Sequence, residues 1–409
     1  MGTAMRWRGM VSGLLAATVV AAVAPASPAR ADDRSTYLVV LRDGAGDPAA
    51  VGAALVARVG GTLGFVYRNA LPGFAASLPA VAVDALRLDP LVASIEPDQV
   101  LRMTAETVPT GIRRIQANRN PVAKINGVDD VRIDVDIAVI DTGIDATHPD
   151  LNVVGRVDCT NAKACVSGGT DNNGHGTHVA GTAAAIDNGF GVVGVAPGAR
   201  LWSVKVLGKD GSGSLTGIMA GLDWVAGQSS TIEVVNLSLG CADCGSKAMS
   251  RAISAAVDRG VVVVVAAGND ATDASRFFPA NHPDAITVSA LADFDGAPGG
   301  SGPSTCLRDA DDSLAPFSNY GTVVDVAAPG ACIYSTYPGG RYATMSGTSM
   351  AAPHVTGAAA LLAAGVNDPT SRADVAAITA RIKATGSHAW TDDSNDGRQE
   401  PLLNARTLG

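Results

Sequence analysis

Short, uniformly apolar runs separated by helical patterns constrain the fold of this chain more than any other feature. Residues 261–268 read VVVVVAAG, and the runs at 135–141 (VDIAVID), 201–207 (LWSVKVL) and 233–239 (EVVNLSL) are nearly as apolar. The helical patterns between them are HGTHVAGTAAAI, SLTGIMAGLDWVAG and SKAMSRAISAAVDRG. Strands of this composition are buried on both faces. From about residue 133 we therefore expect an α/β domain with a mostly parallel, open sheet and helices on both faces.

A smaller unit is expected before this domain. Between residues 32 and 104 the patterns follow the order strand, helix, strand, strand, helix, strand, which is that of a split βαβ, or ferredoxin-like, α+β fold. The unit has no cysteine and no evident catalytic residues, and a polar stretch, RMTAETVPTG, follows it at 102–111. The sequence thus predicts a small domain at 32–104 and a large domain at 105–409.

The first 31 residues have the pattern of a secretory signal peptide. Two arginines precede an apolar stretch at 10–23, and Ala29 and Ala31 form a small-x-small cleavage signal. An uncleaved membrane anchor is the alternative, although the apolar stretch is short for a span and Pro25 follows it. We therefore expect a secreted, extracellular protein with no membrane attachment once residues 1–31 are removed.

Composition excludes other classes. The chain has 409 residues, 47% of them hydrophobic, which suits one large globular domain with appendages. Its formal net charge is −9 and it has no long run of lysine or arginine, which argues against a nucleic-acid partner. We expect a monomer.

Six cysteines, all beyond residue 150, suit an exported protein with disulfides. Six cysteines allow many connectivities. We predict two small local loops and one longer one: Cys159 with Cys165, Cys241 with Cys244, and Cys306 with Cys332. A zinc site at the Cys-x-x-Cys pair is the competing interpretation, but no second such pair or nearby histidine completes its ligands.

Three candidate catalytic residues stand in distinctive local sequences. Asp141 ends the apolar run at 135–141, and open α/β sheets bind ligands at the carboxyl ends of their strands. His175 opens a helical pattern in NGHGTHVAGT, and Ser349 opens another in GTSMAAPH. A carboxylate, an imidazole and a hydroxyl in this chain order are one known arrangement of a catalytic triad.

Each of these residues has a simpler interpretation when it is taken alone. Asp141, in DTG, is of a type that forms turns. His175 and His178 are a conceivable zinc pair, although their spacing and the missing glutamate do not fit HExxH. Ser349 is of a type that caps helices. The three residues together favour catalysis.

Six stretches carry a resemblance to a known family: VIDTGID, HGTHVAGT, VKVLGKDGSG, NLSLG, VVVAAGN and SGTSMAAPHVTGAAALL. In order, across about residues 135 to 365, they resemble those of the subtilisin-like serine peptidases, the subtilase family. The resemblance implies a serine endopeptidase in which Ser349 forms an acyl-enzyme, His175 is the general base and Asp141 orients His175. It adds Asn269 as the side-chain donor of an oxyanion hole and implies no cofactor for catalysis.

The resemblance also implies the partners of the site. A polypeptide substrate would pair as an extended strand with two backbone segments: Gly211, Ser212, Gly213 and Ser238, Leu239, Gly240. The unit at 32–104 resembles the inhibitory propeptides of the family, which implies a zymogen that processes itself, with cleavage between about Leu101 and Thr107.

A structural calcium ion is a further implication of the resemblance. The stretch AAAIDNGFGVVGVAP looks like the calcium loop of secreted subtilisins. Side chains of two residues and carbonyls of three would supply oxygens: Asp150 and Asn188, and Ile186, Phe190 and Val192. The alternative is that Asp150 caps a turn and DNG is an ordinary turn.

Other functions compete with a general serine endopeptidase. An esterase of the α/β-hydrolase type would have G-x-S-x-G and the order serine, acid, histidine, whereas GTSMA lacks the last glycine and its serine comes third. Among peptidases, a dedicated maturation protease of narrow specificity competes with the general endopeptidase that we favour. The preferred side chain before the scissile bond is not readable from the sequence.

Overall fold

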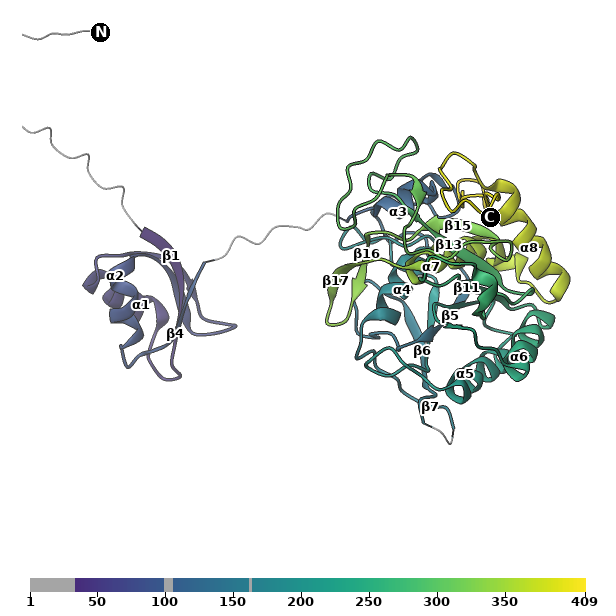
Figure 1. The fold of residues 1–409 in the computed structure, drawn as a ribbon. Helices are drawn as coiled ribbons and strands as arrows, with labels where there is room; N and C mark the ends of the chain where they lie inside the picture. Colours follow the sequence, from purple (N-terminus) through teal and green to yellow (C-terminus); the bar gives the residue numbers. More distant parts are fainter. Residues whose placement is uncertain (1–33, 99–105, 162–163) are drawn as a thin grey trace, which may run out of the picture. The chain divides into compact units, whose positions relative to one another are not determined.

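The computed structural model describes residues 34–98, 106–161 and 164–409 (Figure 1). The predicted signal peptide lies outside these residues. The chain divides into two compact units, Met1–Arg102 and Met103–Gly409. Each unit has its own hydrophobic core.

The first unit is a four-stranded antiparallel sheet with two helices. Its elements are β1 (Arg34–Leu41), α1 (Pro48–Arg58), β2 (Thr62–Tyr67), β3 (Gly73–Pro79), α2 (Ala80–Arg87) and β4 (Val92–Pro97). The strand order is β2-β3-β1-β4. Phe74 and Leu78 of β3 are buried with Leu55 of α1 and Leu86 of α2. The predicted ferredoxin-like α+β arrangement is confirmed.

The second unit is built on a nine-stranded sheet of order β14-β13-β11-β9-β5-β8-β6-β7, in which β15 also pairs with β13. Its strands are β5 (Asp136–Asp141), β6 (Val153–Asp158), β7 (Val166–Ser167), β8 (Arg200–Lys205), β9 (Val234–Leu237), β11 (Val262–Ala266), β13 (Ile286–Ala292), β14 (Ser313–Leu314) and β15 (Val326–Pro329). Pairing is parallel except at β7 and β14. The predicted mostly parallel sheet is therefore confirmed.

Helices cover both faces of this sheet. They are α3 (Thr110–Arg114), α4 (His175–Ala184), α5 (Leu215–Gly227), α6 (Lys247–Asp258), α7 (Thr348–Ala363) and α8 (Arg372–Thr385). Helix α7 contacts β9, β11, β13 and β15, whereas α5 contacts β5 and α6 contacts β11. Every residue of β5, β9, β11 and β13 is buried. Because successive strand residues point to opposite faces, both faces must be covered.

The remaining elements are short. Two antiparallel pairs lie outside the main sheet, β10 (Cys241–Ala242) with β12 (Phe277–Phe278) and β16 (Ile333–Tyr337) with β17 (Arg341–Met345). The single-turn 3-10 helices are η1 (Ala117–Arg119), η2 (Ala274–Arg276) and η3 (Gly365–Asn367).

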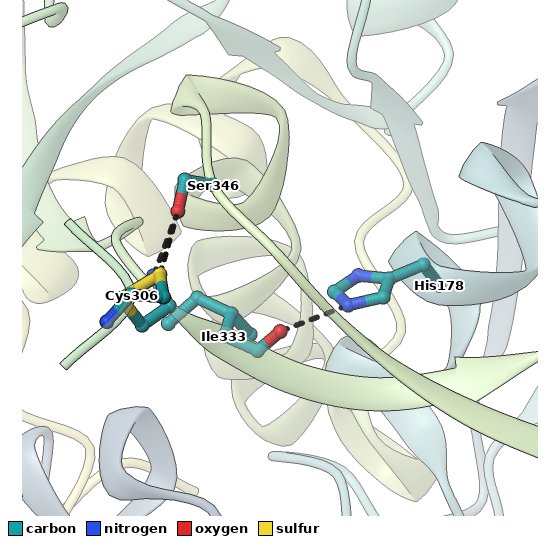
Figure 2. Close-up of a disulfide and its surroundings, with 5 residues drawn as sticks. His178, Cys306, Ile333 and Ser346 are labelled. Atoms are coloured by element: carbon teal, nitrogen blue, oxygen red, sulfur yellow. Dashed lines mark hydrogen bonds between the residues drawn. A yellow bond between two sulfur atoms is a disulfide. The ribbon is translucent and has the colours of Figure 1, made fainter.

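All three predicted disulfides are present: Cys159–Cys165, Cys241–Cys244 and Cys306–Cys332. The pairing of Cys241 with Cys244 rules out the zinc interpretation of these two residues. Figure 2 shows the third disulfide beside Ser346, whose hydroxyl accepts a hydrogen bond from the amide of Cys332 at 2.9 Å. This disulfide therefore adjoins the segment that leads into α7.

Because the central strands of the sheet are fully buried, we expect a cavity among them to lower the free energy of unfolding substantially. Ile137 lies in β5, between β8 and β9, and is fully buried. Ile137→Ala should lower the free energy of unfolding by about 2–5 kcal/mol. Val154→Ala, at a side chain that is 46% exposed on β6, should change it by less than about 0.5 kcal/mol. Denaturant unfolding of both variants in a Ser349→Ala background, which prevents self-digestion, tests this; equal losses would contradict it.

Candidate active site

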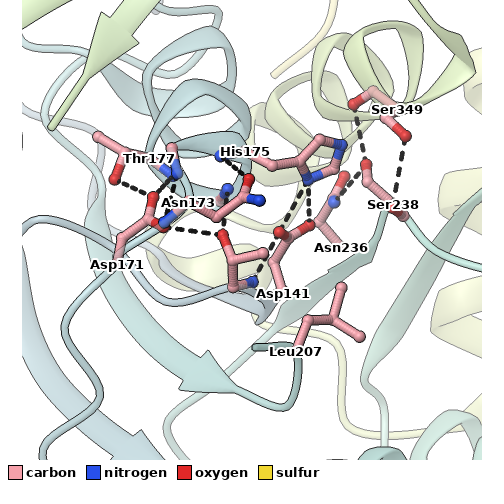
Figure 3. A network of polar contacts seen from close by, with 12 residues as sticks. Asp141, Asp171, Asn173, His175, Thr177, Leu207, Asn236, Ser238 and Ser349 are labelled. Carbon is pink, nitrogen blue, oxygen red and sulfur yellow. Dashed lines mark hydrogen bonds and ion pairs between the residues drawn. The ribbon is translucent and has the colours of Figure 1, made fainter. Parts of the chain in front are cut away.

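A carboxylate and an imidazole meet at the carboxyl end of β5. Asp141, the last residue of β5, is fully buried, and its two oxygens lie 2.8 and 2.9 Å from Nδ1 of His175. His175 is the first residue of α4, and its side chain remains 20% exposed. Figure 3 shows its imidazole between Asp141 and Ser349. The carboxylate thus fixes Nδ1 as a donor and leaves Nε2 on the side of Ser349.

The close approach of α4 to β5 requires a glycine after the histidine. A Cβ on Gly176 would lie 2.2 Å from the carbonyl oxygen of Gly143 and 3.1 Å from Cβ of Asp141. Any larger residue would push the start of α4 away from the end of β5. Gly176 therefore explains locally why the sequence HGTH brings His175 within hydrogen-bond distance of Asp141.

Asp171 joins the two segments that carry the pair. Its Oδ1 accepts hydrogen bonds from the Thr142 hydroxyl at 2.9 Å and from the amides of Asn173 and Gly174. Its Oδ2 accepts from the amide and the hydroxyl of Thr177. Thr142 follows Asp141, and Thr177 lies one residue beyond Gly176. Asp171 is thus a positioning residue, and Figure 3 shows the network that it forms.

Ser349 lies in the first turn of α7, where amides lack intrahelical partners. Pro353 has no N–H to donate to the Ser349 carbonyl one turn back, and the hydroxyl of Ser238 donates to that carbonyl instead, at 2.9 Å. In the described residues the Ser349 hydroxyl donates to the carbonyl of Ser238 at 3.4 Å and forms no hydrogen bond with His175. Catalytic hydrogen bonds are often loose in a free enzyme.

Asn269 follows β11 and faces the start of α7. Its Oδ1 accepts hydrogen bonds from the amide of Thr348 at 2.8 Å and from the Thr348 hydroxyl at 3.0 Å. With the oxygen held in this way, the Nδ2 group is the part of the amide left to donate. Asn269 and Ser349 line the same cavity, of about 260 Å³.

A larger cleft, of about 670 Å³, reaches His175. Its lining includes both backbone segments named from the sequence: Gly211, Ser212, Gly213, Ser238, Leu239 and Gly240. Apolar side chains from α5, α6 and β12, among them Ile218, Met249 and Phe278, form much of the rest. Because Leu239, Gly240 and Phe278 line both cavities, the two are continuous along the same wall.

The electrostatics of the pair favour a protonated imidazole. Burial alone lowers the pKa of His175, but the charge of Asp141 and its hydrogen bond outweigh burial, and Asp171 adds to them. The pKa of His175 is therefore raised above its ordinary value of 6.5. This environment stabilises the imidazolium that forms when the histidine takes a proton.

His178 has a structural position. It is fully buried, and its Nε2 lies 3.0 Å from the carbonyl oxygen of Ile333 and 3.1 Å from that of Ala343. Burial lowers its pKa to about 4. These contacts tie α4 to β16 and β17 and do not resemble a zinc pair with His175.

The predicted calcium loop gathers around Asp150, which is fully buried. One carboxylate oxygen accepts hydrogen bonds from the amide of Val192 at 3.0 Å and the hydroxyl of Tyr342 at 3.1 Å, and the other accepts from Nδ2 of Asn188 at 2.9 Å. The amide of Ile186 donates to the Asp150 carbonyl, and Asn188 Oδ1 accepts from the amide of Phe190. The structure thus brings all five residues together.

A second carboxylate lies at this loop. Glu106 accepts hydrogen bonds from the amides of Asn188 and Gly189. Burial and the neighbouring Asp187 raise the pKa of Glu106 to about 8, and burial raises that of Asp150 to about 6. In the described residues no lysine or arginine forms an ion pair with Asp150 or Glu106. These residues therefore fit a cation, because the loop buries negative charge without a positive partner.

Comparison with known proteins agrees with this geometry. The model of the subtilase family matches residues 133–401, and that of the peptidase inhibitor I9 family matches residues 36–104. This chain belongs to the subtilase family. Subtilases are serine endopeptidases, and this subtilase therefore is one.

Individual relatives support the assignment. The subtilase is 44% identical over 292 residues to an alkaline protease of Alkalihalobacillus alcalophilus, covering 71% of this chain and 69% of the relative. It is 41% identical over 301 residues to subtilisin E of Bacillus subtilis (strain 168), covering 73% and 71%. A solved cold-adapted subtilisin-like serine proteinase superposes with a TM-score of 0.57 at 32% identity, covering 73% of this chain and 98% of that one.

Sequence reasoning about this subtilase missed Asp171, Glu106 and Thr348. Asp171 stands in DNNG and Glu106 in a polar stretch, and both read as turn or linker residues. Thr348 lies in GTSMAAPH, directly before Ser349, and was not singled out from the sequence. A signal for Asp171 does exist, since a carboxylate four residues before His175 lies within reach of the first turn of its helix.

The charge environment predicts a pH profile. A general base must be neutral, so, with His175 in that predicted role, kcat/KM should fall as pH drops through its raised pKa, giving an acid limb above pH 6.5. Asp171→Asn removes a charge that raises this pKa and should move the limb to lower pH, whatever it does to kcat. Asp223→Asn, at an exposed residue of α5, should leave the limb in place. An unmoved limb in Asp171→Asn would contradict the assigned role of its charge.

Proposed function

We propose that this subtilase is a secreted endopeptidase that acts through Asp141, His175 and Ser349 and is made as a self-processing zymogen. The observation that carries the proposal is the hydrogen bond between the buried Asp141 and His175. His175 lines the cleft that residues 211–213 and 238–240 also line. In the described residues no helix is long and apolar enough to span a membrane. Secretion rests on the predicted signal peptide at 1–31.

The residues divide the chemistry of peptide hydrolysis as follows. His175 Nε2 removes the proton from the Ser349 hydroxyl as its oxygen attacks the substrate carbonyl, and then gives this proton to the leaving amine. Asp141 holds the imidazole and stabilises its charged form. The Nδ2 group of Asn269 and the amide of Ser349 donate to the oxyanion. Water then hydrolyses the acyl-enzyme with His175 again acting as the base.

The cleft suits an extended polypeptide. Residues 211–213 and 238–240 offer backbone groups with small side chains, so that a substrate can lie between them as an added strand. The apolar linings of both cavities favour apolar side chains on the acyl side of the scissile bond. A dedicated maturation protease of narrow specificity remains the alternative, and a peptide-library cleavage profile separates the two.

The unit at 32–104 would be the propeptide. It matches the inhibitor I9 family over 36–104 and has a separate core, which supports a role as an inhibitor of its own peptidase domain. We place the cleavage between about Leu101 and Thr107, a region that lies mostly outside the described residues.

Removal of the nucleophile tests both activity and processing. Ser349→Ala should lower kcat by about 10⁶-fold, a magnitude taken from a subtilisin and not from this structure. Its chain should also remain uncut before residue 107. Ser230→Ala, at an exposed serine, should be cut and active. Peptide hydrolysis and mass spectrometry of the N-terminus provide the measurements. Normal activity or processing in Ser349→Ala would refute the proposal.

A structural calcium ion at Asp150 belongs to the same proposal. When bound, the ion would balance the negative charges of Asp150 and Glu106 and stabilise the loop after α4. Asn188 would offer its oxygen after a half-turn of its amide, and carbonyls of Ile186, Phe190 and Val192 would add to the 6–8 oxygens that calcium takes, about 2.3–2.6 Å away.

The melting temperature of the Ser349→Ala protein should then be higher in calcium chloride than in the presence of a chelator. One ion at a hundred times its Kd stabilises the native state by about 2.7 kcal/mol. Asp150→Asn should reduce this calcium-dependent rise, and Asp223→Asn should not. If calcium raised the melting temperature of Asp150→Asn as much as that of its parent, the proposed site would be wrong.

A further inference from the structure

A group of aspartates lies in the loop between β13 and β14, and none of its members lines the cleft. Asp293 follows β13 directly, Asp295 is two residues further on, and Asp311 and Asp312 precede β14. One carboxylate oxygen from each of Asp293, Asp295 and Asp311 lies within 4.8 Å of the other two. Three acidic oxygens from one loop therefore converge on a small volume.

One carboxylate oxygen of this group is buried without a partner. Asp293 is fully buried; its Oδ1 accepts a hydrogen bond from the amide of Gly296 at 3.1 Å, but its Oδ2 has no partner in the described residues. By contrast, both oxygens of Asp311 accept backbone hydrogen bonds, from Phe294 at 2.7 Å and Gly302 at 2.8 Å. A buried acceptor is normally satisfied, so an unpaired carboxylate oxygen points to a missing ligand.

The charge of the group is not balanced by protein. Of the described cations, Arg114 forms the ion pairs: its Nε lies 2.5 Å from Asp312 and 3.8 Å from Asp293. Arg114 thus pairs with two of the four carboxylates, and Arg113, which donates to the carbonyl of Asp295, forms no ion pair with the group in the described residues. Burial, against the opposing charge of Arg114 and with the neighbouring charges of Asp312 and Asp311, raises the pKa of Asp293 to about 8.

We propose that Asp293, Asp295 and Asp311 bind a calcium ion. The donors are all oxygens, which suits a hard cation and excludes the nitrogen and sulfur ligands that zinc prefers. Carboxylates can bind through one or two oxygens in an irregular loop, and calcium accepts this better than magnesium, which requires a near-ideal octahedron. Asp295 is exposed, so water can complete the shell on its side. The site is separate from the one at Asp150.

The ion would fix a loop that joins distant parts of the domain. Arg113 donates to the carbonyl of Asp295, and the amide of Thr391, near the C-terminus, donates to the carbonyl of Asp312. The same loop carries Cys306, whose disulfide with Cys332 adjoins Ser346 (Figure 2). Because Ser346 lies three residues before Ser349, loss of the ion should loosen the approach to α7 as well as the loop.

Calcium stoichiometry tests the site directly. Full-length Ser349→Ala protein is freed of metal with a chelator and dialysed against calcium chloride, and the bound calcium per chain is measured by atomic absorption. Asp293→Asn should bind one ion fewer than its parent. Asp295→Asn, which changes only an exposed side chain, should weaken the binding of one ion at least tenfold. Asp223→Asn is the charge-matched control and should bind as the parent does.

The outcomes separate this site from the one at Asp150. Loss of one ion in Asp293→Asn but none in Asp150→Asn supports the aspartate loop and counts against the Asp150 site. The inference would be overturned if Asp293→Asn and Asp295→Asn both bound as much calcium, and as tightly, as the parent. Should Asp293→Asn fail to fold, the affinity measured for Asp295→Asn decides. A site that magnesium chloride fills as tightly as calcium chloride would overturn the assignment to calcium.

Discussion

The geometry of the pair formed by Asp141 and His175 depends on one other buried carboxylate. Asp171 accepts five hydrogen bonds, from the turn after β5, from the two residues before α4 and from the first turn of α4. A buried carboxylate costs free energy unless hydrogen-bond donors surround it. Moving either segment away from Asp171 would break some of these hydrogen bonds and lower the stability of the fold. The separation of Asp141 and His175 is therefore set from outside the pair, by a residue that touches both of their neighbours.

The sequence predicted those parts of the molecule that local patterns determine. Strands as apolar as residues 261–268 have to be buried on both faces, so they predict a sheet that is covered by helices on both sides. The catalytic candidates were identifiable because their residue types, order and flanking glycines are all unusual. The two short disulfide loops, Cys159–Cys165 and Cys241–Cys244, join cysteines that are close in sequence, as predicted.

The parts that could not be predicted depend on partners far away in the chain. Glu106 meets Asn188 across 82 residues, and Arg114 meets Asp312 across 198. In the local sequence these carboxylates look like any polar residue of a turn. At the predicted calcium loop the structure also directs the Val192 amide at the carboxylate of Asp150, a contact that the sequence does not indicate. The direction of a backbone N–H group is a property of the folded loop, and no pattern of residue types records it.

Helix α7 carries the proposed nucleophile in its first turn and runs through the core of the domain. Of its sixteen residues, Thr348–Ala363, only Ser349 and Leu362 are not buried. A change of volume in a core helix ordinarily costs packing energy and no more. Here the same helix carries the proposed nucleophile in its first turn, so a change of volume along it can also displace the Ser349 hydroxyl. Attempts to make this enzyme more robust should therefore leave α7 alone and work on the opposite face, at α5 and α6, where repacking moves the wall of the cleft but not the nucleophile.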